Sequence, residues 1–208
     1  MGDSKKIVEI PDFPELAFDE EPHIYRLNGV RIPSVTSVME PLNRAKYDGI
    51  SARTLRQAAA KGTAVHNSIE NALKFGFVDI PPEHQGYLEA FLKWRDATKP
   101  EIVASEVKLY HKKMLYAGTV DLLCRIRGDL CLYDYKSVYA VSEMTCGVQL
   151  EAYAQALASH GVRVTRKRIL HLKKDADWKE YDFPVKDAER WRVFGACKTI
   201  YDYASGCK

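Results

Sequence analysis

The sequence lacks the features that mark several common classes of protein. Its five cysteines include no C-x-x-C pair and no spacing typical of a zinc ribbon, which argues against a structural zinc site and favours free thiols. No run approaches the roughly 18 apolar residues that would span a bilayer. The N-terminal stretch also lacks the apolar core of a signal peptide. We therefore expect a cytoplasmic protein with no membrane partner.

A strong charge of one sign is also missing. The 31 basic and 28 acidic side chains leave a formal net charge of only +3, so the total charge does not indicate a protein that binds polyanions. The G-x-x-x-x-G-K-[ST] motif of P-loop NTPases is absent as well. A helicase motor within this chain is thereby excluded.

The length and composition are those of an ordinary globular protein. With 208 residues and a hydrophobic content of 46%, the chain can bury one substantial core. Residues 1–22 hold Pro11, Pro14 and Pro22 among acidic residues, which is typical of an irregular leader. We expect residues 23–208 to form a single domain.

Periodicity predicts an α/β fold with a mixed central sheet flanked by helices. Asn28-Gly29 lies between two alternating stretches and predicts a two-residue hairpin. Helical patterns cover 51–75, with a break expected at Gly62, and then the segment from Pro82 to about Lys99. Alternating strands and further helices follow at 102–111, 116–126, 130–137, 149–159, 166–174, 178–185 and 187–203.

The strand "LCLYDYKS" carries two opposite charges in an otherwise apolar stretch. Asp134 and Lys136 emerge on one face because strand side chains alternate, while Tyr135 points to the other face. Asp121 lies on the preceding strand, which a tight turn brings alongside. A cross-strand ion pair on a solvated face would explain the triplet; so would two carboxylates and an ammonium converging on a site.

Other chemistry-bearing residues surround this strand in the sequence. His66 and Glu70 lie one turn apart on a helix, beside an apolar stripe. Gln149 and Tyr153 share a face of a later helix. Glu106 precedes the hairpin on a neighbouring strand. Taken singly, each has a structural explanation, such as a packed histidine or a solvated charge.

Taken in order, four motifs carry a resemblance to a known family. "GTAVH" (62–66), "AGTVD" (117–121), "DYK" (134–136) and "QLEAY" (149–153) resemble the RecB-like branch of the PD-(D/E)XK nuclease superfamily. The likeness is strongest to small phage, bacterial and mitochondrial-maintenance-type exonucleases, and it covers about 25–203. It implies a restriction-endonuclease-like core and metal-dependent hydrolysis of DNA. The implied setting is DNA recombination, repair or replication in a bacterial or phage-infected cell.

The resemblance also implies a metal site. Asp121 and Asp134 would ligate Mg²⁺ or Mn²⁺, which prefer hard oxygen donors, and the backbone carbonyl of Tyr135 would complete part of the shell. His66 would be an additional metal ligand or a phosphate contact. An imidazole ligand favours Mn²⁺ over Mg²⁺.

The remaining catalytic roles follow from the same resemblance. Lys136 would orient or help deprotonate the attacking water, or stabilise the charge of the transition state. Gln149 and Tyr153 would line the cleft, fix Lys136 or the water, and touch the DNA backbone. The roles of Glu70 and Glu106 stay open.

Basic residues outside these motifs are candidates for DNA binding. Residues 163–174 carry six basic residues and no acid, which indicates either a solvated strand edge or a phosphate track. Residues 53–61 could line the opposite wall. The candidates are Arg53, Arg56, Lys61, Arg166, Arg168 and Lys173. We expect a DNA partner that is single-stranded or has free ends, and a recombination or replication protein as a further partner.

One departure from the family concerns iron. Several relatives hold an iron-sulfur cluster with one upstream and three clustered downstream cysteines. Here no cysteine precedes Cys124, and only Cys197 and Cys207 lie near the end, so no cluster is expected. Two alternatives to an exonuclease remain, a non-catalytic DNA-binding module of the same fold and an endonuclease.

Overall fold

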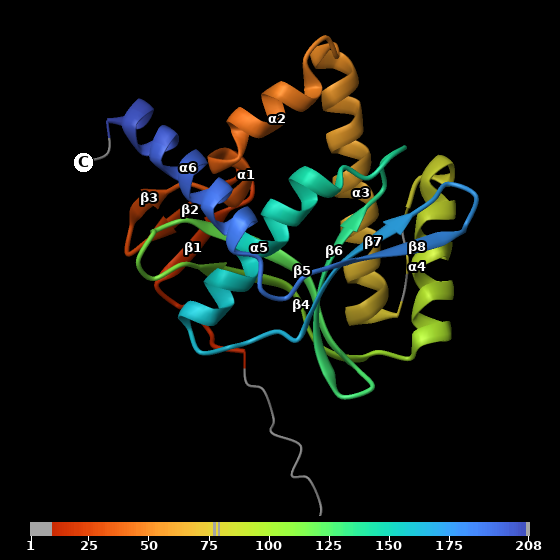
Figure 1. Ribbon diagram of the computed structural model, residues 1–208. Helices are drawn as coiled ribbons and strands as arrows, with labels where there is room; N and C mark the ends of the chain where they lie inside the picture. Colours follow the sequence, from red (N-terminus) through yellow and green to blue (C-terminus); the bar gives the residue numbers. More distant parts are fainter. Residues whose placement is uncertain (1–9, 77, 79, 207–208) are drawn as a thin grey trace, which may run out of the picture.

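A computed structural model describes residues 10–76, 78 and 80–206 (Figure 1). The first half of the chain forms β1 (Leu16–Asp19), β2 (Ile24–Leu27), β3 (Val30–Ile32), α1 (Val35–Val38), α2 (Glu40–Tyr47), α3 (Ala52–Phe75), the 3₁₀ helix η1 (Pro82–His84) and α4 (Gln85–Thr98). The second half forms β4 (Glu101–Tyr110), β5 (Ala117–Ile126), β6 (Asp129–Lys136), α5 (Glu143–Ser159), β7 (Arg166–Leu172), β8 (Trp178–Phe183) and α6 (Ala188–Ser205).

The centre is a five-stranded sheet in the order β4-β5-β6-β7-β8. Strands β6 and β7 pair in parallel and the other neighbours are antiparallel, so the sheet is mixed as predicted. The parallel pair requires a crossover, which α5 provides. A second sheet, β1-β2-β3, lies beside the first and is joined to it by a bridge between Ser34 and Ala117.

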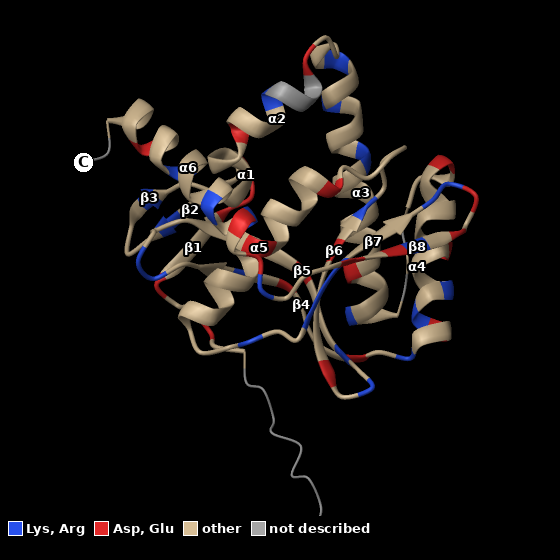
Figure 2. Cartoon of the chain, viewed as in Figure 1, with Lys and Arg blue, Asp and Glu red and all other residues tan. Residues whose placement is uncertain are grey.

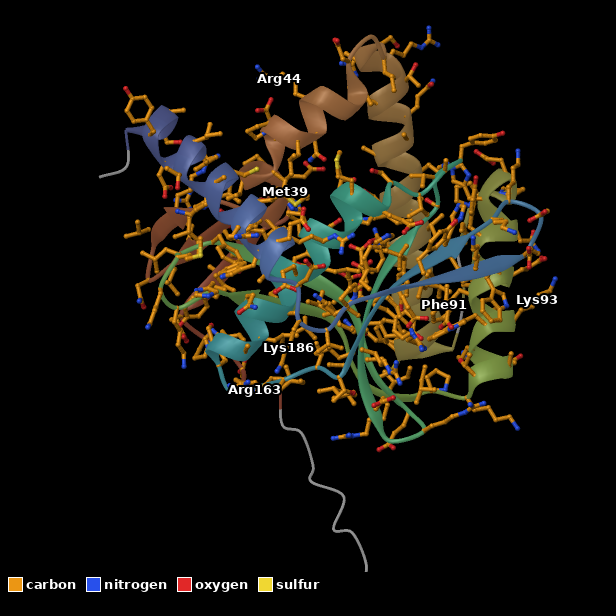
Figure 3. The ribbon with its side chains drawn as sticks, viewed as in Figure 1. Met39, Arg44, Phe91, Lys93, Arg163 and Lys186 are labelled. Carbon is orange, nitrogen blue, oxygen red and sulfur yellow. The ribbon has the colours of Figure 1, made fainter. Side chains whose placement is uncertain are left out.

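Helices cover both faces of the central sheet (Figure 1). Helices α3 and α4 pack on one face through a core that includes Ile69, Phe91 and Tyr133. Helices α1, α5 and α6 pack on the other. Figure 3 shows how α4 divides its side chains, because Phe91 points toward the sheet while Lys93 points away from it. Among the described residues, no helix is long and apolar enough to cross a membrane.

The N-terminal segment differs in part from the expectation of an irregular leader. Residues 16–19 form β1, which pairs with β2 in the register Leu16 opposite Leu27. Leu16 is buried there against Tyr25, so apolar burial outweighs the flanking prolines. Residues 1–9 of the expected leader lie outside the described residues. The hairpin at Asn28-Gly29 is confirmed, with positive φ values of 50° and 81°.

Helix α3 is continuous, and the break expected at Gly62 does not occur. Ser51 caps the first turn by accepting a hydrogen bond from the Thr54 amide, and Gly76 ends the helix in the left-handed conformation. The hydroxyl of Thr63 donates to the Ala59 carbonyl within the uninterrupted helix. A single glycine costs a helix about 1 kcal/mol, which the packing of the apolar stripe offsets.

One lysine of the basic strand β7 is buried in the interior and does not lie on the surface. Lys167 is fully buried, and its ammonium forms an ion pair with Glu151 of α5, which is buried too. The pair ties the crossover helix to the sheet. Two buried charges are tolerated when they neutralise each other, whereas a single one is strongly unfavourable.

Breaking this pair should destabilise the fold far more than removing it. We predict that Glu151→Leu lowers the free energy of unfolding by about 3–5 kcal/mol, because the Lys167 ammonium is left buried and unpaired. The double variant Glu151→Leu/Lys167→Met should recover most of that loss. Urea unfolding of the three proteins measures both effects, and equal stability of the single and double variants would contradict the pairing.

Candidate metal centre

A groove of about 790 Å³ opens between α3, the β4–β6 end of the central sheet and the small N-terminal sheet. Most of the residues singled out in the sequence line it. They are His66, Glu70, Glu106, Asp121, Asp134, Lys136, Gln149 and Tyr153. Residues that are up to 87 positions apart, from 66 to 153, therefore meet in one cleft.

Asp121 lies where β5 and β6 stop pairing. The ladder between these strands runs from Ile126 opposite Asp129 to Leu122 opposite Tyr133 and ends there. Beyond that point the Asp121 carboxylate reaches across, and its Oδ2 accepts a hydrogen bond of 2.6 Å from the Tyr135 amide. The side chain thus replaces a ladder bond, which fixes its direction.

Asp121 forms a compact group with His66 and Glu106. One potential ligand atom from each residue lies within 4.8 Å of the others. The Nδ1 atom of His66 is 3.5 Å from Oδ1 of Asp121. Glu106 is brought in from β4, whose register places Ser105 opposite Leu122 and Val107 opposite Val120.

The backbone of Glu106 is unusual. Its φ of 50° lies in the left-handed region, which a non-glycine residue seldom adopts inside a strand. The sequence left its role open because strand alternation alone does not reveal this kink. The opposition of Glu106 to Asp121 becomes visible only once the register of β4 on β5 is known.

A second group continues from Asp134 along α5. Lys136 Nζ lies 2.6 Å from Asp134 Oδ2 and donates to Gln149 Oε1 at 3.0 Å. Gln149 Nε2 in turn donates to the Tyr153 hydroxyl at 3.1 Å. The ammonium is therefore held between a carboxylate and an amide, while Tyr135 packs into the core on the other face.

Burial and neighbouring charges shift the pKa values of the groups in this cluster. Burial, assisted by the Asp121 carboxylate, raises the pKa of Glu106 to about 7. Burial also raises the pKa of Asp134 to about 6, although the Lys136 ammonium opposes this. Burial would lower the pKa of His66, but Asp121 outweighs it and raises that pKa to about 9. Positive charge among these carboxyl groups would lower the free energy of their ionised forms.

Comparison with known proteins identifies the family to which this chain belongs. The model of the PD-(D/E)XK nuclease superfamily matches residues 82–196, more than half of the chain. This range includes Asp121, Asp134, Lys136 and Gln149. The chain belongs to the PD-(D/E)XK nuclease superfamily. His66 lies outside the matched residues.

Other comparisons add little to this PD-(D/E)XK assignment. A solved structure described as the crystal structure of SSO0001 aligns with a TM-score of 0.39 at 11% sequence identity. The alignment covers 70% of this chain and 74% of that chain. No curated protein matches this sequence.

The residues of this PD-(D/E)XK site fit a divalent cation. Carboxylate oxygens suit Mg²⁺ and Mn²⁺, and an imidazole is accepted by Mn²⁺. The sequence predicted Asp134 as a metal ligand, but the compact group contains Glu106 in its place. Asp134 lies beside the group and is paired with Lys136. Burial and the Asp121 carboxylate raise the pKa values of both acids, and a divalent cation bound beside them would favour their ionised forms.

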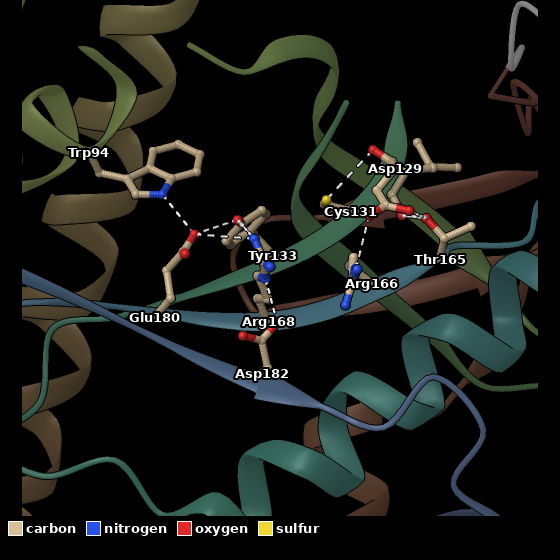
Figure 4. A network of polar contacts seen from close by, with 10 residues as sticks. Trp94, Asp129, Cys131, Tyr133, Thr165, Arg166, Arg168, Glu180 and Asp182 are labelled. Atoms are coloured by element: carbon tan, nitrogen blue, oxygen red, sulfur yellow. Dashed lines mark hydrogen bonds and ion pairs between the residues drawn. The ribbon is translucent and has the colours of Figure 1, made fainter. Parts of the chain in front are cut away.

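The basic residues predicted to bind DNA do not line the groove. Figure 4 shows Arg166 paired with Asp129, and Arg168 with Glu180 and Asp182. Lys173 pairs with Asp177. These carboxylates come from distant or neighbouring parts of the chain and already neutralise the cations. A DNA contact by these three residues stays a prediction.

The remaining candidates lie on α3. Arg53 and Arg56 are exposed near its first turn, and the Lys61 ammonium lies 5.0 Å from the centre of the Tyr87 ring. Figure 2 shows lysine and arginine residues spread over several elements, among them α2, α3 and α4. Their contact with DNA likewise stays a prediction.

Cation binding should be measurable without catalysis. We predict that Mg²⁺, Mn²⁺ or Ca²⁺ raises the melting temperature, with a stabilisation of about 2.7 kcal/mol at 100 times the dissociation constant. Glu106→Gln should reduce this shift, because it removes an anionic donor, yet leave the metal-free protein at least as stable.

Asp177→Asn is the matched control, since Asp177 lies in a surface ion pair outside the groove. Differential scanning fluorimetry across a range of metal concentrations measures the melting temperatures of the wild type, Glu106→Gln and Asp177→Asn. A wild-type chain that shows no metal-dependent shift would contradict the cation site. An unaltered shift in Glu106→Gln would remove Glu106 from it.

Proposed function

We propose that this chain is a Mg²⁺- or Mn²⁺-dependent deoxyribonuclease of the RecB-like branch that acts as an exonuclease. The observation that carries the proposal is the meeting of Asp121, Asp134 and Lys136, with His66 opposite, in one open groove. Hydrolysis of a phosphodiester requires attack by water on phosphorus and departure of the 3′ oxygen. An open groove gives an extended strand access to such a site.

Asp121, Glu106 and His66, with Asp134 beside them, would hold the cation. When bound, the cation would stabilise the negative charge that develops on the phosphoryl oxygens. The Tyr135 amide keeps the Asp121 carboxylate aimed into the groove. The Tyr135 carbonyl remains a proposed further ligand.

Lys136 would act on the phosphoryl group through its charge. The Asp134 carboxylate outweighs the effect of burial and raises the pKa of Lys136, so the side chain is an ammonium at neutral pH. An ammonium donates hydrogen bonds and stabilises anionic oxygen, but it does not accept a proton. Gln149 is a positioning residue in this proposal, because it holds the ammonium from the α5 side.

The exonuclease assignment rests on the motif set. His66 and the pair Gln149 and Tyr153 belong to the exonuclease-rich branch in the resemblance, and all three line the groove beside the acids. The same resemblance supports a role in recombination, repair or replication, on DNA that is single-stranded or has free ends. A recombination or replication protein would supply the DNA ends.

Removing the ammonium should abolish most of the activity. We predict that Lys136→Met lowers the hydrolysis rate by about 10²- to 10⁴-fold, because a charge-stabilising donor next to the phosphoryl group is lost. Lys93→Met, which alters an exposed side chain of α4 outside the groove, should retain the wild-type rate. Initial rates with Mg²⁺ and with Mn²⁺ measure both variants.

Two results would contradict parts of this proposal. DNA binding by the wild-type chain without cleavage in either metal would favour the non-catalytic module. Undiminished cleavage by Lys136→Met would remove that residue from the mechanism. Melting curves of each variant establish that the proteins compared are folded.

The need for a free end can be tested separately. We predict that end-labelled linear DNA is degraded while a covalently closed single-stranded circle of the same sequence persists, because an exonuclease requires a terminus. Gel electrophoresis over a time course distinguishes the two substrates. Cutting of the closed circle at a comparable rate would make the enzyme an endonuclease.

A further inference from the structure

The N-terminal sheet contributes aromatic rings to the groove that the proposed chemistry does not use. Phe18 of β1, and His23 from the turn between β1 and β2, both line it. Their ring centres lie 4.9 Å apart in an edge-to-face arrangement. Tyr25 lies behind them, 4.5 Å from Phe18 and 5.7 Å from His23. The three rings form one aromatic platform.

The platform is anchored to the strand that carries Asp121. The Tyr25 hydroxyl and the Thr119 hydroxyl are hydrogen-bonded at 2.8 Å, and Thr119 precedes Asp121 by two residues on β5. Tyr25 is almost fully buried, so the rings above it have a fixed base. Whatever binds to the platform is therefore held in a fixed relation to the acidic cluster.

His23 is presented to solvent by a strained backbone. Its φ of 62° lies in the left-handed region, and its amide donates to the Glu20 carbonyl at 2.9 Å to close the turn. The residue is exposed although its ring contacts two other rings. Strained conformations at the mouth of a cleft often have a functional reason.

The charges of the groove limit how DNA can bind there. Among the described residues that line it, three lysines face five acids. Lys74 is paired with Glu70 and Lys136 with Asp134. Lys108 lies 5.5 Å from the centre of the Phe18 ring, so a cation accompanies the platform. Phosphate contacts alone are therefore few, so the aromatic rings that line the groove are a further source of affinity.

We propose that Phe18 and His23, with Lys108 beside them, form a subsite that stacks on an unpaired nucleobase of the strand being cut. The proposal rests on the proposed nuclease function and names its substrate as single-stranded DNA or a frayed end. A paired base in a duplex is stacked on its neighbours and does not offer its face to a protein ring. Lys108 would contact the phosphate next to the stacked base.

The test separates binding from cleavage. Fluorescence anisotropy measures the affinity of a short labelled single strand, and of its duplex, in Ca²⁺ at constant salt. The proteins are wild type, Phe18→Leu, His23→Asn and the control Tyr203→Ala, which removes an exposed aromatic ring on α6 outside the groove. Asparagine tolerates the left-handed backbone of His23, and leucine keeps Phe18 apolar.

We expect each platform variant to weaken single-strand binding by about 5- to 100-fold, since one base–aromatic stack is worth about 1–3 kcal/mol. Duplex binding and the Tyr203→Ala control should change little. An abasic residue moved along the strand should weaken wild-type binding at one position and have no effect there on His23→Asn. A flat abasic profile, or platform variants equal to the control, would overturn the subsite.

The same data separate this proposal from the function on which it rests. Position-dependent abasic loss in a chain that cuts no DNA with Mg²⁺ or Mn²⁺ would support the stacking subsite and refute the nuclease. Metal-dependent cleavage with a flat abasic profile would support the nuclease and refute the subsite. If Phe18→Leu fails to fold, His23→Asn still decides, because His23 is exposed.

Discussion

The hydrogen bond from the Tyr135 amide to Asp121 is the contact on which the site depends. It occupies the point where β5 and β6 separate, and the separation is what opens room for a groove between the sheet and α3. The same bond directs Asp121 toward His66, while the pairing of β6 with β7 keeps Asp134 and Lys136 on one face. Without this hydrogen bond, the Tyr135 amide would lack a protein partner where the strand pairing ends, and the Asp121 carboxylate would be hydrogen-bonded to water with no fixed direction.

The price of this arrangement is electrostatic. Glu106, Asp121 and Asp134 share a half-enclosed groove, and the first and last of them have raised pKa values because burial disfavours their charged forms. Like charges held this close destabilise the folded chain, as does the left-handed backbone of Glu106. Two large apolar cores, one on each face of the sheet, offset the cost. Stability is thus concentrated away from the groove, as is common where a site must bind a cation.

Much of this could be predicted from the sequence, because the decisive signals are local. Strand alternation places Asp134 and Lys136 on one face, and helical spacing places Gln149 and Tyr153 on another. Features that depend on strand register or on partners distant in the sequence could not be predicted from the sequence. The kink at Glu106 needs the pairing of β4 on β5, and the ion pairs of Arg168 need Glu180 and Asp182 from the next strand. Lys167 looked like part of a surface charge run because its partner lies on α5.

The ion pairs formed by the basic residues affect which nucleic acid the groove can bind. A duplex presents two rows of phosphates and rewards a continuous cationic surface. Here Arg166 and Arg168 of β7 are paired with carboxylates around a separate pocket of about 320 Å³ near the N-terminal end of β6, and the groove itself is rich in acids. Attraction for a polyanion is therefore concentrated where a divalent cation and Lys136 would sit. If the proposed function holds, such a groove would suit a ligand that brings its phosphate to one point and gains the rest of its affinity from ring faces, as a single strand can do.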